Sequence, residues 1–237
     1  FTRGWSSAAS DVYKSQVYSI SNSAPLTLAA DLMEYAQLWR TTGDIRDTWK
    51  SVSDIAFKRQ DVWAGYRRPG AWPDADMMVL GCVGWGKYEH PINPTRLTPD
   101  EQYSHMTMWC MLSSPLILGC DLTRADDFLL SLLTNDEVIA VNQDELGLSP
   151  AKRYGDGTYA TYIKCLADGS IAVAMFNLSD QPKTIGFIPL SLGLVEDQVI
   201  RDLWRQEDVA KVAFRERWEC EVAPHGVRFL KLSPGSI

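Results

Sequence analysis

The sequence predicts an α/β domain followed by an all-β domain, and two patterns along the chain carry this prediction. Up to residue 141, short apolar runs alternate with longer segments whose apolar residues recur at helical spacing, which is typical of parallel strands joined by crossover helices. After Gly147, short runs of alternating polarity are separated by turn residues, which indicates antiparallel strands. The change falls near residues 148–152, so we expect an α/β domain over 1–148 and a β-domain over 149–237.

The first domain is expected to begin with a strand at residues 17–21, because β-branched and aromatic side chains gather there before a loop. Residues 26–39 have helical spacing of their apolar side chains, and so do residues 49–58. Residues 77–80 are apolar on both faces, as in a buried parallel strand.

Residues 81–99 form a long loop, and its aromatic content argues against disorder. Thr98 and Pro99 then predict the start of a helix, with threonine as the N-cap and proline at the first helical position. A strand is expected at 115–119 and a further helix around 128–133. The side chains of chemical interest in the loop are Trp85, Tyr88, His90 and Arg96.

Six short runs of the second domain are expected to be strands, because turn pairs such as Asp168-Gly169 and His225-Gly226 separate them. Antiparallel strands joined by tight turns pack into a sandwich or a barrel. The six runs are residues 159–166, 171–178, 184–190, 199–204, 217–222 and 227–232.

Composition excludes several classes of protein. With 237 residues, 46% of them hydrophobic, the chain can bury a substantial core. Its net charge of −7, without a long basic run, argues against nucleic acid as a partner. Its longest apolar runs fall far short of the roughly 20 residues that span a bilayer, so we expect no membrane span. Residues 1–5 lack the pattern of a signal peptide.

The five cysteines form no Cys-x-x-Cys pair and no Cys/His cluster at zinc spacing, so we expect no metal. Their odd number leaves at least one thiol free. The histidines are scattered along the chain, and we expect His105 and His225 to be core or turn residues.

The stretch of residues 38–49 places Arg40 and Asp44 four residues apart, between Trp39 and Trp49. An arginine that can bind two hydroxyls, a neighbouring carboxylate and aromatic rings are the side chains that a carbohydrate site requires. The same spacing also fits a simple ion pair on the surface of a helix. Both interpretations are open on this stretch alone.

Four blocks of sequence, with a fifth at RDLW (201–204), resemble glycoside hydrolase family 27, the α-galactosidase and α-N-acetylgalactosaminidase family. This resemblance implies the second half of a (β/α)8 TIM barrel, the region of strands 5–8, followed by a C-terminal antiparallel β-sandwich. The four blocks are LWRTTGDI (38–45), PGAWPDADM (69–77), SPLILGCDL (114–122) and VIAVNQDELG (138–147).

The resemblance also implies a retaining glycosidase that works with two carboxylates and no cofactor. By position in the motifs, Asp44 resembles the acid/base and Arg40 the residue that binds the sugar near its 2-position. Asp76 and Met77 resemble residues that line the floor of the sugar pocket. Two further residues are expected to bind substrate, Trp39 beside Arg40 and Ser21 in the loop after the fifth strand.

Two departures from the family pattern leave the sugar open. The family's Trp-Asn-Asp-Pro-Asp reads Trp72-Pro73-Asp74-Ala75-Asp76 here, and residues 21–25 replace a loop that carries a glutamate in many α-galactosidases. A galactose-containing oligosaccharide is the expected substrate, with a β-L-arabinopyranoside or an α-glucan as alternatives. The long loop at residues 81–99 could shape the leaving-group side of the site through Trp85 or Tyr88, or it could be exposed to solvent without a role in the site.

The family's nucleophile is an aspartate in a Lys-x-Asp stretch, and none occurs before Ser21, where the only acid is Asp11. We therefore expect a fragment that is inactive alone and completed by an N-terminal barrel half in a longer, secreted or periplasmic enzyme. The alternative is a non-catalytic carbohydrate-binding or assembly module that kept the sugar contacts.

Overall fold

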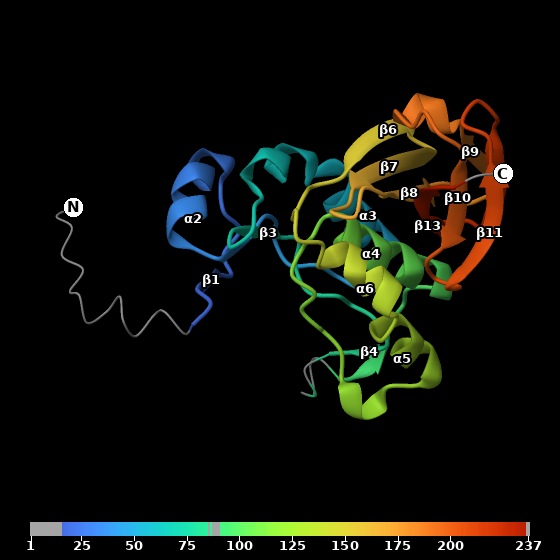
Figure 1. Ribbon diagram of the computed structural model, residues 1–237. Coiled ribbons are helices and arrows are strands. Elements are labelled where there is room, and N and C mark those ends of the chain that lie inside the picture. The colour runs from blue at the N-terminus through green and yellow to red at the C-terminus, as the bar shows by residue number, and fades with distance from the viewer. Residues whose placement is uncertain (1–15, 85, 87–90, 236–237) are drawn as a thin grey trace.

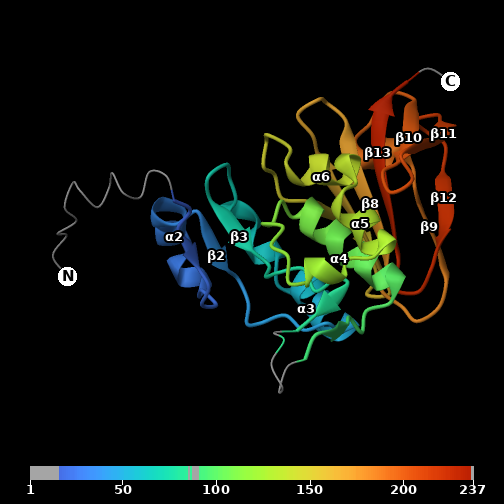
Figure 2. The same cartoon turned by 90° about the horizontal axis from the view of Figure 1, so that it is seen from below.

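The computed structural model describes residues 16–84, 86 and 91–235. Its N-terminal part contains a three-stranded parallel sheet of order β1-β2-β3, formed by Ser19–Ile20, Leu38–Arg40 and Trp72–Asp74 (Figure 1). Figure 2 shows β2 and β3 beside α2, at the end of the molecule away from the C-terminal strands. Parallel strands joined by helices confirm the predicted α/β class for this part.

Helices connect and flank these strands. The Thr98 hydroxyl accepts a hydrogen bond from the backbone N of Glu101, and the Glu101 carboxylate accepts one from the backbone N of Thr98. The predicted start of the helix at Pro99 is therefore confirmed as a capping box. The helices are α2 (Ala29–Tyr35), α3 (Trp49–Lys58), α4 (Pro99–Met111), α5 (Asp127–Leu133) and α6 (Asp136–Asn142), with short 3-10 turns at Leu26–Leu28, Asp61–Tyr66, Leu122–Arg124 and Pro189–Leu192.

The predicted helix over 26–39 is wrong at its C-terminal end. The helix stops at Tyr35, and Trp39 lies in β2, paired with Ile20 on one side and Pro73 on the other. Because this pairing buries Trp39 completely, sheet formation outweighs the helical spacing of the local sequence.

The strands predicted at 77–80 and 115–119 are also wrong. These segments meet in a single parallel bridge between Met78 and Leu118. The preceding residue, Asp76, has a φ of 87°, which turns the chain out of the strand direction after β3. Side chains then satisfy the amides that a ladder would use, with His105 accepting from Val79 and Gln102 accepting from Gly81.

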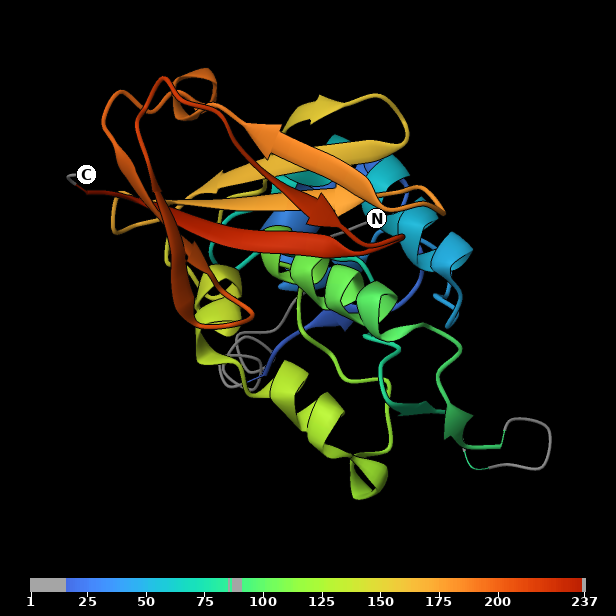
Figure 3. The ribbon, with the colours of Figure 1, turned by 90° about the vertical axis from the view of Figure 1, so that its right-hand side faces the viewer.

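The predicted antiparallel domain is confirmed as a sandwich of a six-stranded sheet, in the order β11-β10-β13-β8-β7-β6, and the pair β12-β9 (Figure 3). The edge strands β6 and β11 were not predicted, because their side chains are mostly exposed and show no alternation. The strands are β6 (Ala151–Gly155), β7 (Tyr159–Cys165), β8 (Ile171–Asn177), β9 (Lys183–Phe187), β10 (Gln198–Asp202), β11 (Glu207–Val212), β12 (Trp218–Val222) and β13 (Val227–Pro234).

The loop expected at 81–99 contains a small hairpin of β4 (Cys82–Val83) and β5 (Asn93–Pro94). Trp85, Tyr88 and His90, which the sequence analysis singled out, lie outside the described residues.

One hydrophobic core joins the two parts of the chain. Helix α4 packs against β8 and β13 (Figure 3). Its Trp109 belongs to the same buried cluster as Phe176 and Phe229. The buried amine of Lys164 on β7 donates to Val141 O at 2.6 Å and to Ser113 Oγ at 2.6 Å, at the C-terminal ends of α6 and α4. The β-sandwich therefore supports the helices behind the parallel sheet. Across the part of the chain that the structure describes, no helix has the length and apolar character of a membrane span.

Candidate active site

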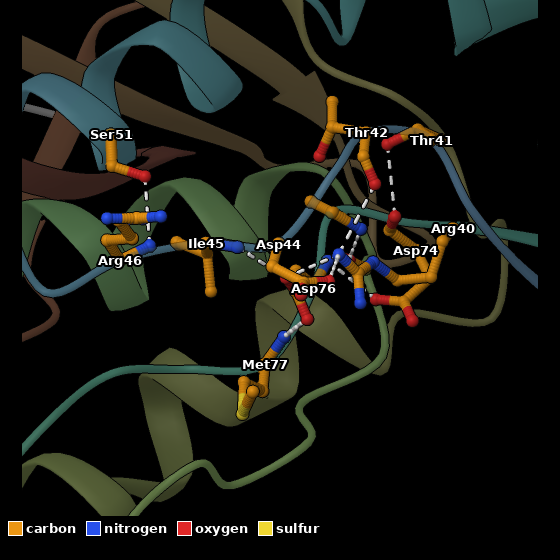
Figure 4. Close-up of polar contacts among 12 residues, drawn as sticks. Arg40, Thr41, Thr42, Asp44, Ile45, Arg46, Ser51, Asp74, Asp76 and Met77 are labelled. Atoms are coloured by element: carbon orange, nitrogen blue, oxygen red, sulfur yellow. Dashed lines mark hydrogen bonds and ion pairs between the residues drawn. The ribbon is translucent and has the colours of Figure 1, made fainter. Parts of the chain in front are cut away.

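Arg40 is the last residue of β2, and its side chain is buried between two carboxylates (Figure 4). Its Nη2 lies 2.5 Å from Asp76 Oδ2 and 3.3 Å from Asp44 Oδ1, and it also donates to Thr42 O at 3.3 Å. Its Nε has no hydrogen-bond partner among the described residues. The carboxyl end of β2 thus carries a cation that Asp76 and Asp44 hold in place.

Asp44 lies in the loop after β2, and its side chain is 90% exposed. The loop is held from both sides because Thr42 and Ile45 are buried. The Arg40–Asp44 ion pair is present, but it spans the end of a strand and a loop, so the alternative of a pair on a helix surface is wrong. The exposed carboxylate is therefore free to meet a solute while its backbone is fixed.

Asp76 is enclosed by protein donors, with its side chain only 4% exposed. Besides Arg40, its Oδ2 accepts from Ile45 N at 2.7 Å, and its Oδ1 accepts from Met77 N at 2.7 Å (Figure 4). Asp76 therefore fixes both Arg40 and the loop beside Asp44. Met77, half-buried, packs against the backbone of Gly119.

Asp74 and Trp109 hold Asp76 in its left-handed backbone conformation. Asp74 Oδ1 accepts from Asp76 N at 2.8 Å, and Trp109 Nε1 donates to Asp76 O at 2.6 Å. Burial raises the pKa of Asp74, although the bond from Asp76 N and the charge of Arg40 oppose this effect. The sequence analysis missed these two supporting roles, and the Asp-x-Asp spacing was the available signal for Asp74.

The structure brings Ser21, Arg40, Asp44, Asp76 and Met77 to one region of the parallel sheet. Ser21 is exposed and follows β1, whose Ile20 pairs with the residue before Arg40.

Trp39 does not join this group, because its ring is fully buried against Trp63, with the ring centroids 6.4 Å apart. Its buried position supports the sheet and leaves no ring face exposed to a sugar. Trp49, the other tryptophan of the stretch, stacks on His225 at 4.5 Å, on the side of the β-domain.

No group of three or more histidine, cysteine or acidic side chains within residues 16–84, 86 and 91–235 is arranged to hold a metal ion. His105 is buried in α4, as expected, and His225 lies in the turn before β13.

The charged cluster lies at the carboxyl ends of parallel strands, where the active sites of (β/α)8 barrel enzymes lie. The model of the α-galactosidase A family matches residues 7–144, and the model of the α-galactosidase C-terminal β-sandwich domain matches residues 156–232. The chain belongs to the α-galactosidase family, glycoside hydrolase family 27.

Individual relatives are similar along most of the chain. Alpha-galactosidase 2 of Arabidopsis thaliana is 35% identical over 211 residues, which are 88% of this chain and 49% of the relative. A probable α-galactosidase of Dictyostelium discoideum is 35% identical over 208 residues, 85% of this chain and 50% of the relative.

A solved structure, the family 27 β-L-arabinopyranosidase of Geobacillus stearothermophilus, superposes with a TM-score of 0.87 at 35% identity. The match covers 96% of this chain and 52% of that one. The chain thus has the fold of part of the (β/α)8 barrel followed by the β-sandwich, and it spans about half the length of the curated relatives it matches.

Proposed function

We propose that this chain supplies the acid/base half of the active site of a retaining glycosidase that removes terminal α-galactosyl groups. The observation that carries the proposal is the exposed Asp44 carboxylate beside Arg40, which Asp76 holds in place. In this role Asp44 protonates the oxygen of the leaving group and then takes a proton from the attacking water. Arg40 orients the sugar through a hydroxyl.

The second carboxylate, the nucleophile, would come from the complementary half of the barrel. The length of the relatives supports this part of the proposal, because the matched segment is about half of each. The substrate would then be a galactose-containing oligosaccharide or glycoside bound between the two halves.

A second candidate substrate is a β-L-arabinopyranoside. The similarity to an arabinopyranosidase of known structure favours it, at the same identity as the first α-galactosidase relative. The two sugars have the same ring configuration and differ in the hydroxymethyl group of galactose. Discrimination between them therefore depends on whether a side chain fills the space of that group.

The test measures hydrolysis of nitrophenyl α-galactoside and nitrophenyl β-L-arabinopyranoside by this chain alone and by the full-length protein that contains it. We expect turnover only in the full-length protein, and a loss of roughly 10²–10⁴-fold in kcat with Asp44→Asn. Glu196→Gln, an exposed acid in the β-domain, is the control and should leave turnover unchanged.

Turnover by the chain alone that Asp44→Asn abolishes would refute the need for a second half. Sugar binding without turnover in the full-length protein would favour the non-catalytic carbohydrate-binding module.

A further inference from the structure

Asp47, three residues after Asp44, is bound by a residue from a distant loop. Arg96 donates to Asp47 Oδ2 from its backbone N at 3.1 Å and from Nε at 3.1 Å, and to Oδ1 from Nη2 at 2.7 Å. A two-pronged arginine–carboxylate contact fixes orientation as well as distance. The additional bond from the backbone joins the two chain segments directly.

The segment around Arg96 is itself held in place. Thr95 donates from its backbone to Gly81 O at 2.7 Å and from its hydroxyl to Val79 O at 2.9 Å. On the other side, Leu97 is buried in the main core. Arg96 therefore projects from a fixed backbone, although its own side chain is 65% exposed.

The chain that follows Asp44 is thus fixed at three points, and one of them is the bond from Arg46 N to Ser51 Oγ at 2.9 Å. Asp76 holds Ile45 N on one side of the loop, and Arg96 holds Asp47 on the other. Thr48 then caps α3 by accepting from Ser51 N. If Arg96 is removed, the loop keeps its contacts at Ile45 and Arg46 and loses the one at Asp47.

We propose that Arg96 is a positioning residue for Asp44, acting through Asp47 to hold the acid/base carboxylate in line with the oxygen of the leaving group. This inference rests on the proposed function. General acid catalysis requires hydrogen-bond reach, and a displacement of about 1 Å can cost on the order of 10²-fold in rate.

The Asp47–Arg96 contact persists at neutral pH. Burial alone would raise the pKa of Asp47, but the hydrogen bonds and the charge of Arg96 outweigh it and hold that pKa below its ordinary value.

The test uses Arg96→Ala, Arg96→Lys and Asp47→Asn in the full-length protein, with two substrates that share the sugar and differ in the leaving group. A dinitrophenyl glycoside needs little protonation of its leaving oxygen, whereas an alkyl glycoside needs it fully. We expect Arg96→Ala to lower kcat/KM for the alkyl glycoside roughly tenfold more than for the dinitrophenyl glycoside. Arg96→Lys keeps the positive charge but loses the two-pronged contact of the guanidinium. Its kcat/KM for the alkyl glycoside should therefore lie between those of Arg96→Ala and wild type.

Combining Arg96→Ala with Asp47→Asn should add little to either change, because both break the same contact. Arg153→Ala, an exposed arginine on β6, should leave both substrates unaffected. Equal losses on the two substrates, or additive losses in the double variant, would overturn the inference. Failure of the proposed function has a different signature, in which Asp44→Asn itself leaves alkyl glycoside hydrolysis intact.

Amide hydrogen exchange of the chain supplies a second readout that needs no substrate. Arg96→Ala should speed exchange in the segment around Asp44 at least several-fold and leave α4 unchanged, because only the contact of the loop at Asp47 is lost. Unchanged exchange near Asp44 would contradict the positioning role directly.

Discussion

His105 makes the stability of this chain sensitive to mild acid. Its ring is fully buried in α4, where Nε2 accepts from Val79 N at 3.1 Å and the ring packs edge-on against Trp109 with centroids 4.1 Å apart. Burial lowers the pKa of His105 from 6.5 to about 3. Trp109 in turn holds Asp76, so the neutral imidazole supports the site from behind.

The magnitude follows from linkage between protonation and folding. Because the pKa of His105 is lower in the folded chain, the unfolded chain takes up its proton first, and stability is lost as pH falls below 6.5. Between about pH 7.5 and about pH 5 this effect amounts to about 2 kcal/mol. Most carboxylates remain ionised at about pH 5, so they contribute little in this window.

The assay is urea unfolding of wild type and His105→Gln at both pH values, followed by tryptophan fluorescence. Glutamine offers an oxygen to Val79 N and does not titrate. The loss of stability on acidification should therefore be about 2 kcal/mol larger in wild type than in the variant. Because both proteins contain the same other histidines, the contribution of those histidines cancels when the variant is compared with wild type. An equal loss in both proteins would refute the account of His105 as a buried neutral acceptor.

Two further predictions concern the packing behind the site. Burial lowers the pKa of Lys164 from 10.5 to about 8, so wild type should gain up to ~3 kcal/mol relative to Lys164→Met as pH rises from about 8 to 10.5, measured by urea unfolding. If the difference in stability between wild type and Lys164→Met did not change across this pH range, the amine would be exposed to water and the prediction would be wrong. A methyl group at Gly119 would lie 2.6 Å from Met77 Sδ and 3.0 Å from Met78 O, so Gly119→Ala should cost roughly 1–3 kcal/mol. Gly65→Ala, with no atom within 4 Å of the added methyl, should change stability by less than about 1 kcal/mol.

Local signals in the sequence explain why some elements could be predicted. Thr98, Pro99 and Glu101 stand within one helical turn and satisfy each other's backbone groups, so the start of α4 needs no distant partner. The turn at Asp168-Gly169 works in the same way, because Asp168 accepts from Ser170 N two residues on. Such elements depend on neighbours in sequence.

Other elements depend on residues far along the chain. Trp39 continues the helical spacing of Leu32 and Ala36, and only its pairing with β1 and β3 makes it a strand residue. The amide of Val79 is satisfied by His105, 26 residues away, so residues 77–80 pair with the segment at 115–119 only at Met78. The apolar residues of a segment alone therefore predict neither the strand pairing of Trp39 nor the bond from Val79 to His105.

The site shows the same division. The spacing of Arg40 and Asp44 predicts their contact, and the structure contains it at 3.3 Å. The contact between Asp47 and Arg96 spans 49 residues, and no local pattern connects them. The sequence could therefore propose the acid and the arginine, but not what holds the acid in place.

A crystal structure of the full-length protein with galactose or L-arabinopyranose bound tests the central claim most directly. The account predicts a guanidinium nitrogen of Arg40 within hydrogen-bond distance of a ring hydroxyl, and the Asp44 carboxylate beside the anomeric oxygen. A sugar bound elsewhere, with Asp44 facing solvent and Arg40 in contact with protein carboxylates alone, would contradict it.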